Sequence, residues 1–489
     1  MTVSSADMPS RLFFAVCLAL LLAAPGRGWS QQSGPVAGPV RLTPIRPLVP
    51  APDEKPEPAR PGPAPQSVIG VPGGPGAGDG GAVTTGVTPG GPGVNVEVDT
   101  LTTINPDAAG ALTEDQGGFP ASMWRGTSRR LVDSLLVKLP VNTASMAMRG
   151  LMRRLLLSAA VVPQGAAEPG ALVALRVRLL ADMGDFVGVN QLLNAIPGRD
   201  LNPDLVFVEA NSRFLANDNA RACVLAAGQI RTQENAFWHK AFIFCQALAG
   251  ETDKAALGVE LLREMGEDDQ AFYDLVDSLS GGGVVSIESL ADPSPLHLAM
   301  ARVAKAQLPP DVISSNRPSI LNTIATSPNA PVELRMEAAE RAEAAGALPV
   351  EALRQLYTSV SFSDEDLANP LSKAEAESGP LSRALLYRTA LIQTVPTAQA
   401  EAVSRALSLA REGGRYASTV RVFTGVLKNI PPSPELLWFA PEAVRAFLFL
   451  ADHESADVWF GLLSSSAMFD RQAGLDLKAL MPLARLSDS

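Results

Sequence analysis

Cys223 and Cys245 are the pair of residues whose types and spacing most directly suggest chemistry. If the helices that carry them meet at a turn near residues 233–234, the two cysteines lie at nearly equal distances from that turn. Antiparallel helices then bring them to the same height, so a disulfide is feasible in an oxidising compartment, where it would close a loop of about 22 residues. The alternative is two buried thiols that pack as small apolar groups.

The other residues with catalytic or metal-binding potential are scattered. His239, His297 and His453 are far apart in the sequence and stand at no metal-ligand spacing from a cysteine or carboxylate. The acidic clusters 267–269 and 364–366 are interpreted as helix-end charges. No motif of a metalloprotease, serine hydrolase, phosphate-binding loop or dinucleotide fold occurs. We therefore expect no catalytic residue, no metal and no cofactor, and a protein that is not an enzyme.

An aromatic cluster near the C-terminus is the strongest candidate for a binding surface. Aromatic residues make up only 5% of the chain, yet six of them lie between residues 438 and 460. They are Trp438, Phe439, Phe447, Phe449, Trp459 and Phe460. Two interpretations are open: the six line a groove that receives a partner's helix or strand, or they form the core of a terminal cap.

Helices are expected to position these residues, because residues 172–262 repeat one helix–turn–helix pattern three times. The turns are marked by Gly184-Asp185, Asp218-Asn219 and Gly250-Glu251, which lie 34 and then 32 residues apart. Apolar residues follow each turn at the same offsets: Val189, Leu193 and Ile196; Cys223, Ala227 and Ile230; Ala255, Val259 and Leu262. A hairpin of this length cannot bury its apolar face alone, so the pattern predicts an all-α solenoid of stacked hairpins.

The turns and second helices of these hairpins resemble tetratricopeptide repeats. The resemblance is carried by Gly184-Asp185-Phe186, by Gly250-Glu251-Thr252-Asp253-Lys254-Ala255, by Ala451-Asp452-His453-Glu454-Ser455-Ala456, and by Arg415-Tyr416 with Phe423 and Val426. It covers residues 172–262 and, in part, residues 405–463. The first helices depart from the family pattern, with Val177, Asn211 and Ile243 at positions of small residues and Arg176 at a usually apolar one. The resemblance implies a curved array whose concave side binds a peptide or protein segment, with non-standard packing angles.

Two helical arrays are expected to make up the folded part of the chain. The first covers residues 101–280 and the second, with a terminal cap, residues 295–482. The triple glycine 281–283 between them predicts a hinge or a change of repeat register. Capping residues predict individual helices, among them 124–139 and 144–161 in the first array and 364–377 in the second. The pairs Arg129-Arg130 and Arg153-Arg154 are expected to face solvent on the first two of these helices.

The N-terminal hundred residues are expected to target and tether the protein. Residues 1–28 contain Arg11, an apolar run over residues 12–24 and then small residues, as in a cleaved signal peptide; an uncleaved inner-membrane anchor is the alternative. Residues 29–100 form a Pro/Gly-rich tether that is predicted to be disordered, because 29 of the positions 31–100 are proline or glycine. Val94, Val96 and Val98 alternate with polar residues, which indicates a short strand.

Net charge excludes two classes of partner. The chain carries a charge of −11, and −12 without residues 1–28. A chain this acidic, with no basic stripe, is not expected to bind nucleic acid or anionic lipid, and after signal cleavage no apolar run is long enough to span a membrane. We therefore expect a periplasmic scaffold or adaptor that binds another envelope protein through its helical-repeat surface. The alternative is a glycan- or polymer-recognising accessory subunit of a cell-envelope enzyme.

Overall fold

The computed structural model describes residues 105–199 and 202–487, and throughout these residues the fold is all-helical. The described residues form 21 α-helices that pack in neighbouring pairs, as in an α-solenoid, and they contain isolated β-bridges but no β-strand. No helix within these ranges is long and apolar enough to cross a membrane. The expected signal peptide, the Pro/Gly-rich tether and the strand at residues 94–98 lie outside the described residues.

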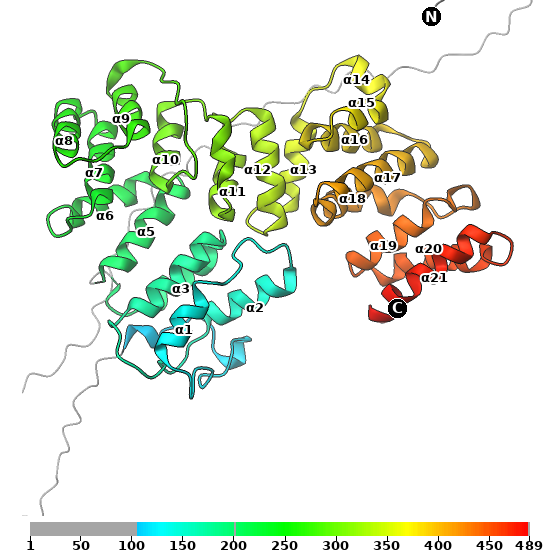
Figure 1. Ribbon diagram of the computed structural model, residues 1–489, viewed down its shortest axis with the longest axis horizontal. Coiled ribbons are helices and arrows are strands. Elements are labelled where there is room, and N and C mark those ends of the chain that lie inside the picture. The colour runs from blue at the N-terminus through cyan, green and yellow to red at the C-terminus, as the bar shows by residue number, and fades with distance from the viewer. Residues whose placement is uncertain (1–104, 200–201, 488–489) are drawn as a thin grey trace, which may run out of the picture. The chain divides into compact units, whose positions relative to one another are not determined.

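Three of the helical pairs coincide with the repeated pattern. They are α3 (Ala171–Asp182) with α4 (Phe186–Ala195), α5 (Pro203–Leu215) with α6 (Asn219–Gln229), and α7 (Ala236–Leu248) with α8 (Thr252–Glu264). They are preceded by α1 (Arg129–Leu136) and α2 (Met146–Leu157) and followed by α9 (Gln270–Asp277), as Figure 1 shows. Helix α1 begins later than predicted, because Ser128 caps it by accepting a hydrogen bond from the Leu131 N–H.

The repeat period differs from the predicted one. The second residue after each first helix adopts a left-handed conformation, and these residues, Gly184, Asn217 and Gly250, lie 33 residues apart in both intervals. The turn of the second hairpin is therefore Asn217-Asp218 and was predicted one residue too late, at Asp218-Asn219, because asparagine stands there in place of glycine. Its apolar series was wrong by the same residue: Ala222 and Ala226 are buried, whereas Ala227 is exposed.

A disulfide joins Cys223 on α6 to Cys245 on α7, with the two Cα atoms 5.6 Å apart. It connects the second helix of one hairpin to the first helix of the next. The covalent link therefore stands at a boundary between repeat units, where a solenoid otherwise depends on packing between neighbours alone.

Removing this disulfide is expected to destabilise the array. The double substitution C223A/C245A should lower the free energy of unfolding by about 3 kcal/mol, because the unfolded chain regains the freedom of a closed loop. Guanidinium denaturation followed by circular dichroism measures this. A reductant should lower the denaturation midpoint of the native chain and leave that of the double variant unchanged; equal midpoints for the native chain with and without reductant would contradict the expectation.

The chain changes direction after α9. That helix continues into a short π-helical turn, Ser278–Gly282, which ends with Gly281 in a left-handed conformation at φ 104°. The next helix, α10 (Pro295–Ala304), packs against α9 and also back against α5. Helix α11 (Pro318–Thr326) likewise contacts α3 and α5. The glycine-rich stretch thus brings a later part of the chain onto the first helices of the earlier hairpins.

The remaining helices continue the paired arrangement to the end of the described chain. They are α12 (Val332–Ala344), α13 (Val350–Ser359), α14 (Asp364–Ala368), α15 (Pro370–Ala376), α16 (Pro380–Ile392), α17 (Pro396–Glu412), α18 (Tyr416–Asn429), α19 (Ala440–Phe449), α20 (His453–Ser466) and α21 (Arg471–Leu486). The single helix predicted at residues 364–377 is wrong. Pro370 cannot donate a backbone hydrogen bond, so it begins a new helix after Asn369.

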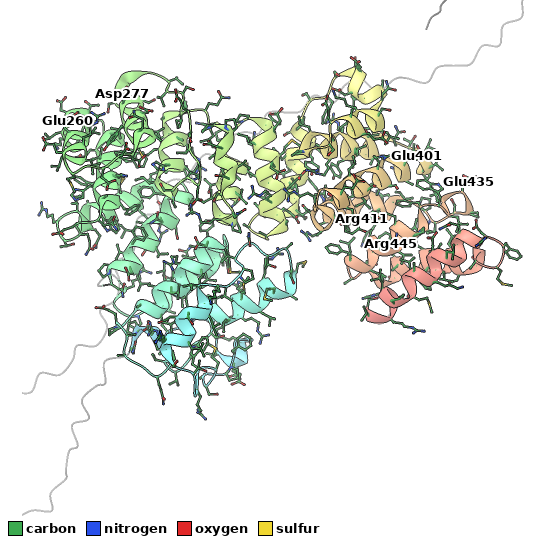
Figure 2. The ribbon with its side chains drawn as sticks, in the orientation of Figure 1. Glu260, Asp277, Glu401, Arg411, Glu435 and Arg445 are labelled. Carbon is green, nitrogen blue, oxygen red and sulfur yellow. A yellow bond between two sulfur atoms is a disulfide. The ribbon has the colours of Figure 1, made fainter. Side chains whose placement is uncertain are left out.

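Ion pairs connect the terminal helices to their neighbours. Figure 2 shows Arg411 at the end of α17 and Arg445 on α19; both approach Glu442, with N–O distances of 2.6 and 3.8 Å. Arg411 also lies over the ring of Tyr416, 5.1 Å from its centroid. Because these ion pairs lie at the surface, they contribute little to the free energy of unfolding.

The N-terminal segment is held by buried charges. Asp107 accepts hydrogen bonds from Arg129 at 2.9 Å and from the Val173 N–H at 2.9 Å. Arg129 is itself buried, so the expectation that this arginine faces solvent was wrong. A buried cation needs a carboxylate partner, and the partner here lies 22 residues earlier in the chain.

Candidate functional site

The six C-terminal aromatic residues do not line a common groove. Phe439, Phe447 and Trp459 are buried in the core of the terminal helices, and the rings of Phe439 and Trp459 meet edge to face at 5.7 Å. Phe460 lines a small pocket of about 220 Å³ between α19, α20 and α21. Trp438 and Phe449 are 50% and 42% exposed, but Phe449 packs on the ring of Tyr416.

The histidines and acidic clusters take part in helix-end contacts. Asp269 caps α9 by accepting a hydrogen bond from the Phe272 N–H. The same carboxylate lies 2.9 Å from Lys240 Nζ and 3.0 Å from His297 Nε2. Burial alone would raise the pKa of Asp269, but the hydrogen bonds from His297 and Lys240 bring it well below its usual range. Asp269 therefore joins α7, α9 and α10 as a fixed anion.

His239 lies on α7 next to Lys240, and His453 lies at the start of α20; no contact between either histidine and Asp269 is present within the described residues. In the cluster 364–366, Asp366 forms a capping box with Ser363 at the start of α14. No group of three or more histidine, cysteine, aspartate or glutamate side chains in the described parts of the chain is arranged to hold a metal ion. The histidines and the acidic clusters 267–269 and 364–366 thus lie at separate places in the described structure.

Asp269→Asn is expected to lower the free energy of unfolding by about 2 kcal/mol at neutral pH, because asparagine still caps α9 but cannot pair with Lys240. The pKa of Asp269 is depressed on folding, so its contribution is present above the unfolded pKa of about 4 and is lost as the pH falls further. The difference in stability between the native chain and the variant should therefore narrow below about pH 4. Denaturation at several pH values measures it, with the exposed neighbour Asp268→Asn as control. A difference that does not change with pH would contradict this assignment.

A groove runs along the first helices of the hairpins in the earlier array. One part, of about 410 Å³, is lined by α1, α3, α5 and the start of α7. A second part, of about 290 Å³, lies between α3, α5, α7 and the starts of α10 and α11. The two parts share Arg178, Phe207 and Val208 in their linings, so they adjoin.

The groove was not predicted, although the sequence contains a signal for it. Its lining on α3 includes residues 171, 174, 175, 178 and 182, and its lining on α5 includes the equivalent residues 204, 207, 208, 211 and 215. The spacing is identical on both helices and the offset is one repeat of 33 residues. Such a series marks one face of each helix. What the sequence does not indicate is that α10 and α11 stand opposite that face.

Charge within the groove is neutralised internally only in part, because the exposed side chains of Arg178 and Asp204 form no ion pair within the described residues. Asp133 pairs with Arg129 at 2.9 Å, and Arg317 pairs with Asp292 at 3.2 Å while donating to the Pro293 carbonyl at 2.8 Å. Asp182 forms no ion pair or hydrogen bond within the described residues. Burial raises the pKa of the Asp182 carboxyl, and the more distant charges of Arg317 and Arg178 only partly offset this effect.

The aromatic side chains of the groove pack on one another. Phe207 meets Phe237 at 4.6 Å and Trp238 at 6.2 Å, in both cases edge to face. Trp238 is only 2% exposed, whereas Phe207 and Phe237 are partly exposed. The groove therefore offers phenyl edges, aliphatic side chains and a few polar groups, which suits binding of an extended chain.

Comparison with known proteins identifies no family for this chain. No protein-family model matches the chain, and no curated protein or solved structure matches it either. The likeness to tetratricopeptide repeats is therefore carried by the repeated residues themselves.

Proposed function

We propose that this protein is an exported periplasmic scaffold of tetratricopeptide-like hairpins that binds another envelope protein and performs no catalysis. The observation that supports it is the groove formed by two adjoining cavities on α1, α3, α5 and α7. Neighbouring helices pack about 8–10 Å apart, so a groove across four of them has a length of roughly 30 Å. An extended peptide rises about 3.3 Å per residue, and a segment of about nine residues would fill it.

A protein segment suits this lining better than a glycan. Sugar rings bind most readily against an exposed flat aromatic face, and the one tryptophan in the groove, Trp238, is buried by its neighbours. The amides and carboxylates on the first part of the groove, Gln233, Asn235 and Asp204, could still hydrogen-bond to hydroxyl groups. A polymer-recognising accessory subunit is therefore the second candidate, and the experiment below distinguishes it.

Site-specific photocrosslinking tests the proposal. A photoreactive phenylalanine analogue at Leu175, inside the groove, should crosslink to a protein of the envelope fraction. The matched control places the same analogue at Leu257 on α8, which is 73% exposed and lies outside the groove. A band specific to Leu175 supports the scaffold. Equal bands at both positions, or none at Leu175, contradict it; retention of the chain on insoluble cell-wall polymer would instead support the second candidate.

Export belongs to the same proposal and has its own test. The apolar run over residues 12–24 and the small residues after it support cleavage after Gly28 or Ser30. Mass spectrometry of the chain recovered from the periplasm should show this shortened N-terminus. Recovery of the intact N-terminus in the membrane fraction would replace the cleaved signal with an uncleaved anchor.

A further inference from the structure

The inner part of the groove is a small cavity with two contrasting walls. It has a volume of about 290 Å³. One wall is formed by the last turns of α3 and α5, which contribute Asp182, Asn211 and Ser212. The facing wall is formed by the starts of α10 and α11, with Arg317 beside them. The two walls differ in whether their polar groups already have partners.

The wall of α3 and α5 carries acceptors that lack donors. Ser212 is 8% exposed, and its Oγ is buried without a hydrogen-bond partner within the described residues. Asp182 forms no ion pair or hydrogen bond in those residues, although it is partly buried. Asn211 donates through Nδ2 to the Phe207 carbonyl at 2.9 Å, so its Oδ1 is the end of the amide that can accept. A buried oxygen without a donor is unfavourable, and Ser212 Oγ is such an atom. Asp182 and the Asn211 Oδ1 are partly exposed acceptors of the same cavity, so a donor group that enters it would meet all three side chains.

The facing wall is already satisfied. Arg317 is paired with Asp292 and the Pro293 carbonyl, and Ser294 caps α10 by accepting from the His297 N–H. An anion would therefore find no free cation on that wall, and the one unpaired cation of the cavity lining within the described residues is the exposed Arg178 on α3. In addition, Asp182, Asn211 and Ser212 lie near the C-terminal ends of their helices, where the helix dipoles favour positive charge.

We propose that this cavity binds a primary ammonium group on an alkyl stem, namely a lysine side chain of the segment that occupies the groove. An ammonium group has three N–H donors, which match the three acceptors contributed by Asp182, Asn211 and Ser212. Phe207 and Phe237 at the cavity wall would contact the methylene groups of the stem. The inference rests on the proposed function, because it identifies one side chain that the bound segment must carry.

A small probe tests the cavity without the unknown partner. The full chain is titrated with N-acetyl-lysine N-methylamide and, separately, with N-acetyl-norleucine N-methylamide, and binding is followed by saturation-transfer NMR. The lysine probe should bind saturably and the norleucine probe should not. Asp182→Asn should weaken binding of the lysine probe by about tenfold or more, because it removes the charge that faces the ammonium group.

The matched control is Asp253→Asn, at an exposed aspartate on α8 that lies outside the groove. It should leave binding of the lysine probe unchanged. The melting temperature of Asp182→Asn should equal or exceed that of the native chain, because the variant removes a partly buried charge with no partner. This measurement separates loss of binding from loss of folding. Equal binding of both probes, or unchanged affinity in Asp182→Asn, would overturn the ammonium site.

The outcomes also separate this inference from the proposed function. A groove-specific crosslink at Leu175 without binding of the lysine probe would keep the scaffold and remove the ammonium site. Binding of the lysine probe without a groove-specific crosslink would keep the site and remove the scaffold. When both succeed, the crosslinked segment of the partner should contain a lysine, and Asp182→Asn should reduce the yield of the crosslink.

Discussion

Replacing Glu340 by glutamine is expected to lower the free energy of unfolding by about 3–5 kcal/mol, because it breaks a buried ion pair and leaves the Arg383 guanidinium buried without a carboxylate. Glu340 on α12 is 1% exposed. It accepts two hydrogen bonds from the guanidinium of Arg383 on α16, at 2.8 and 2.5 Å, and one from the Tyr357 hydroxyl on α13 at 2.5 Å. One carboxylate therefore holds three helices together.

Burial and the neighbouring Glu340 charge raise the pKa of Tyr357 well above its ordinary value, so this hydroxyl remains a donor at any pH of interest. Urea denaturation followed by circular dichroism measures the effect of Glu340→Gln. The matched control is Glu333→Gln on the same helix, where the side chain is exposed and the change should be within about 0.5 kcal/mol. A loss below about 1 kcal/mol for Glu340→Gln would show that Arg383 finds another partner.

The second large effect is expected for Arg176→Met, with a loss of about 3–5 kcal/mol. Arg176 on α3 is 2% exposed, and burial lowers its pKa to about 10, a change that Asp107 partly offsets. It remains charged at neutral pH. Its guanidinium donates to the carbonyls of Leu156 at 2.8 Å, Ser158 at 2.8 Å and Ala109 at 2.7 Å. The substitution leaves these carbonyls buried without a donor.

Arg178→Met is the matched control, because Arg178 lies on the same helix and is exposed. Its effect on the free energy of unfolding should stay within about 0.5 kcal/mol. Hydrogen exchange would add spatial detail: in Arg176→Met the amides of residues 107–112 and 156–159 should lose protection before those of α5 and α6. Uniform loss of protection across the array would contradict a local clamping role for Arg176.

The hydrogen bonds of the Arg176 guanidinium also explain why position 176 differs from the tetratricopeptide pattern that these hairpins resemble. In that pattern the site is usually apolar, and here it holds an arginine that binds the N-terminal segment and the end of α2. Burial of a charged group costs less when every N–H reaches an oxygen. The segment before α1 is thus packed against the first repeat by a polar contact, where a further hairpin would otherwise stack.

The helices themselves could be predicted from local sequence. Capping residues such as Asp185, whose carboxylate accepts from the Gly188 N–H at 2.8 Å, and prolines at the first positions of α16 and α17 act over four residues or fewer. The two clear errors are local as well. Asn217 took the conformation expected of a glycine, and Pro370 began a second helix.

The candidate groove could be predicted only in part. The repeated series on α3 and α5 shows which helix faces are equivalent, but burial of Asp182 depends on α10 and α11. These helices begin at least 80 residues later in the chain and reach α3 and α5 because the chain reverses after Gly281. The six aromatic residues near the C-terminus were considered as a binding surface, but most of them pack in or beside the core of the terminal helices. Composition alone does not distinguish a buried ring from an exposed one.

The amino-acid sequence alone determined the all-helical class and the stacked pairs, because helix periodicity and capping are properties of neighbouring residues. Tertiary structure alone decided which charged side chains are buried and which acceptors lack donors. Arg129 was expected to face solvent, and no local pattern pairs Arg176 or Glu340; most of their partners lie 17 to 69 positions away and are brought beside them by the fold. The physical reason is that desolvation and pairing of a charge depend on all the atoms around it, and most of those atoms come from distant parts of the chain.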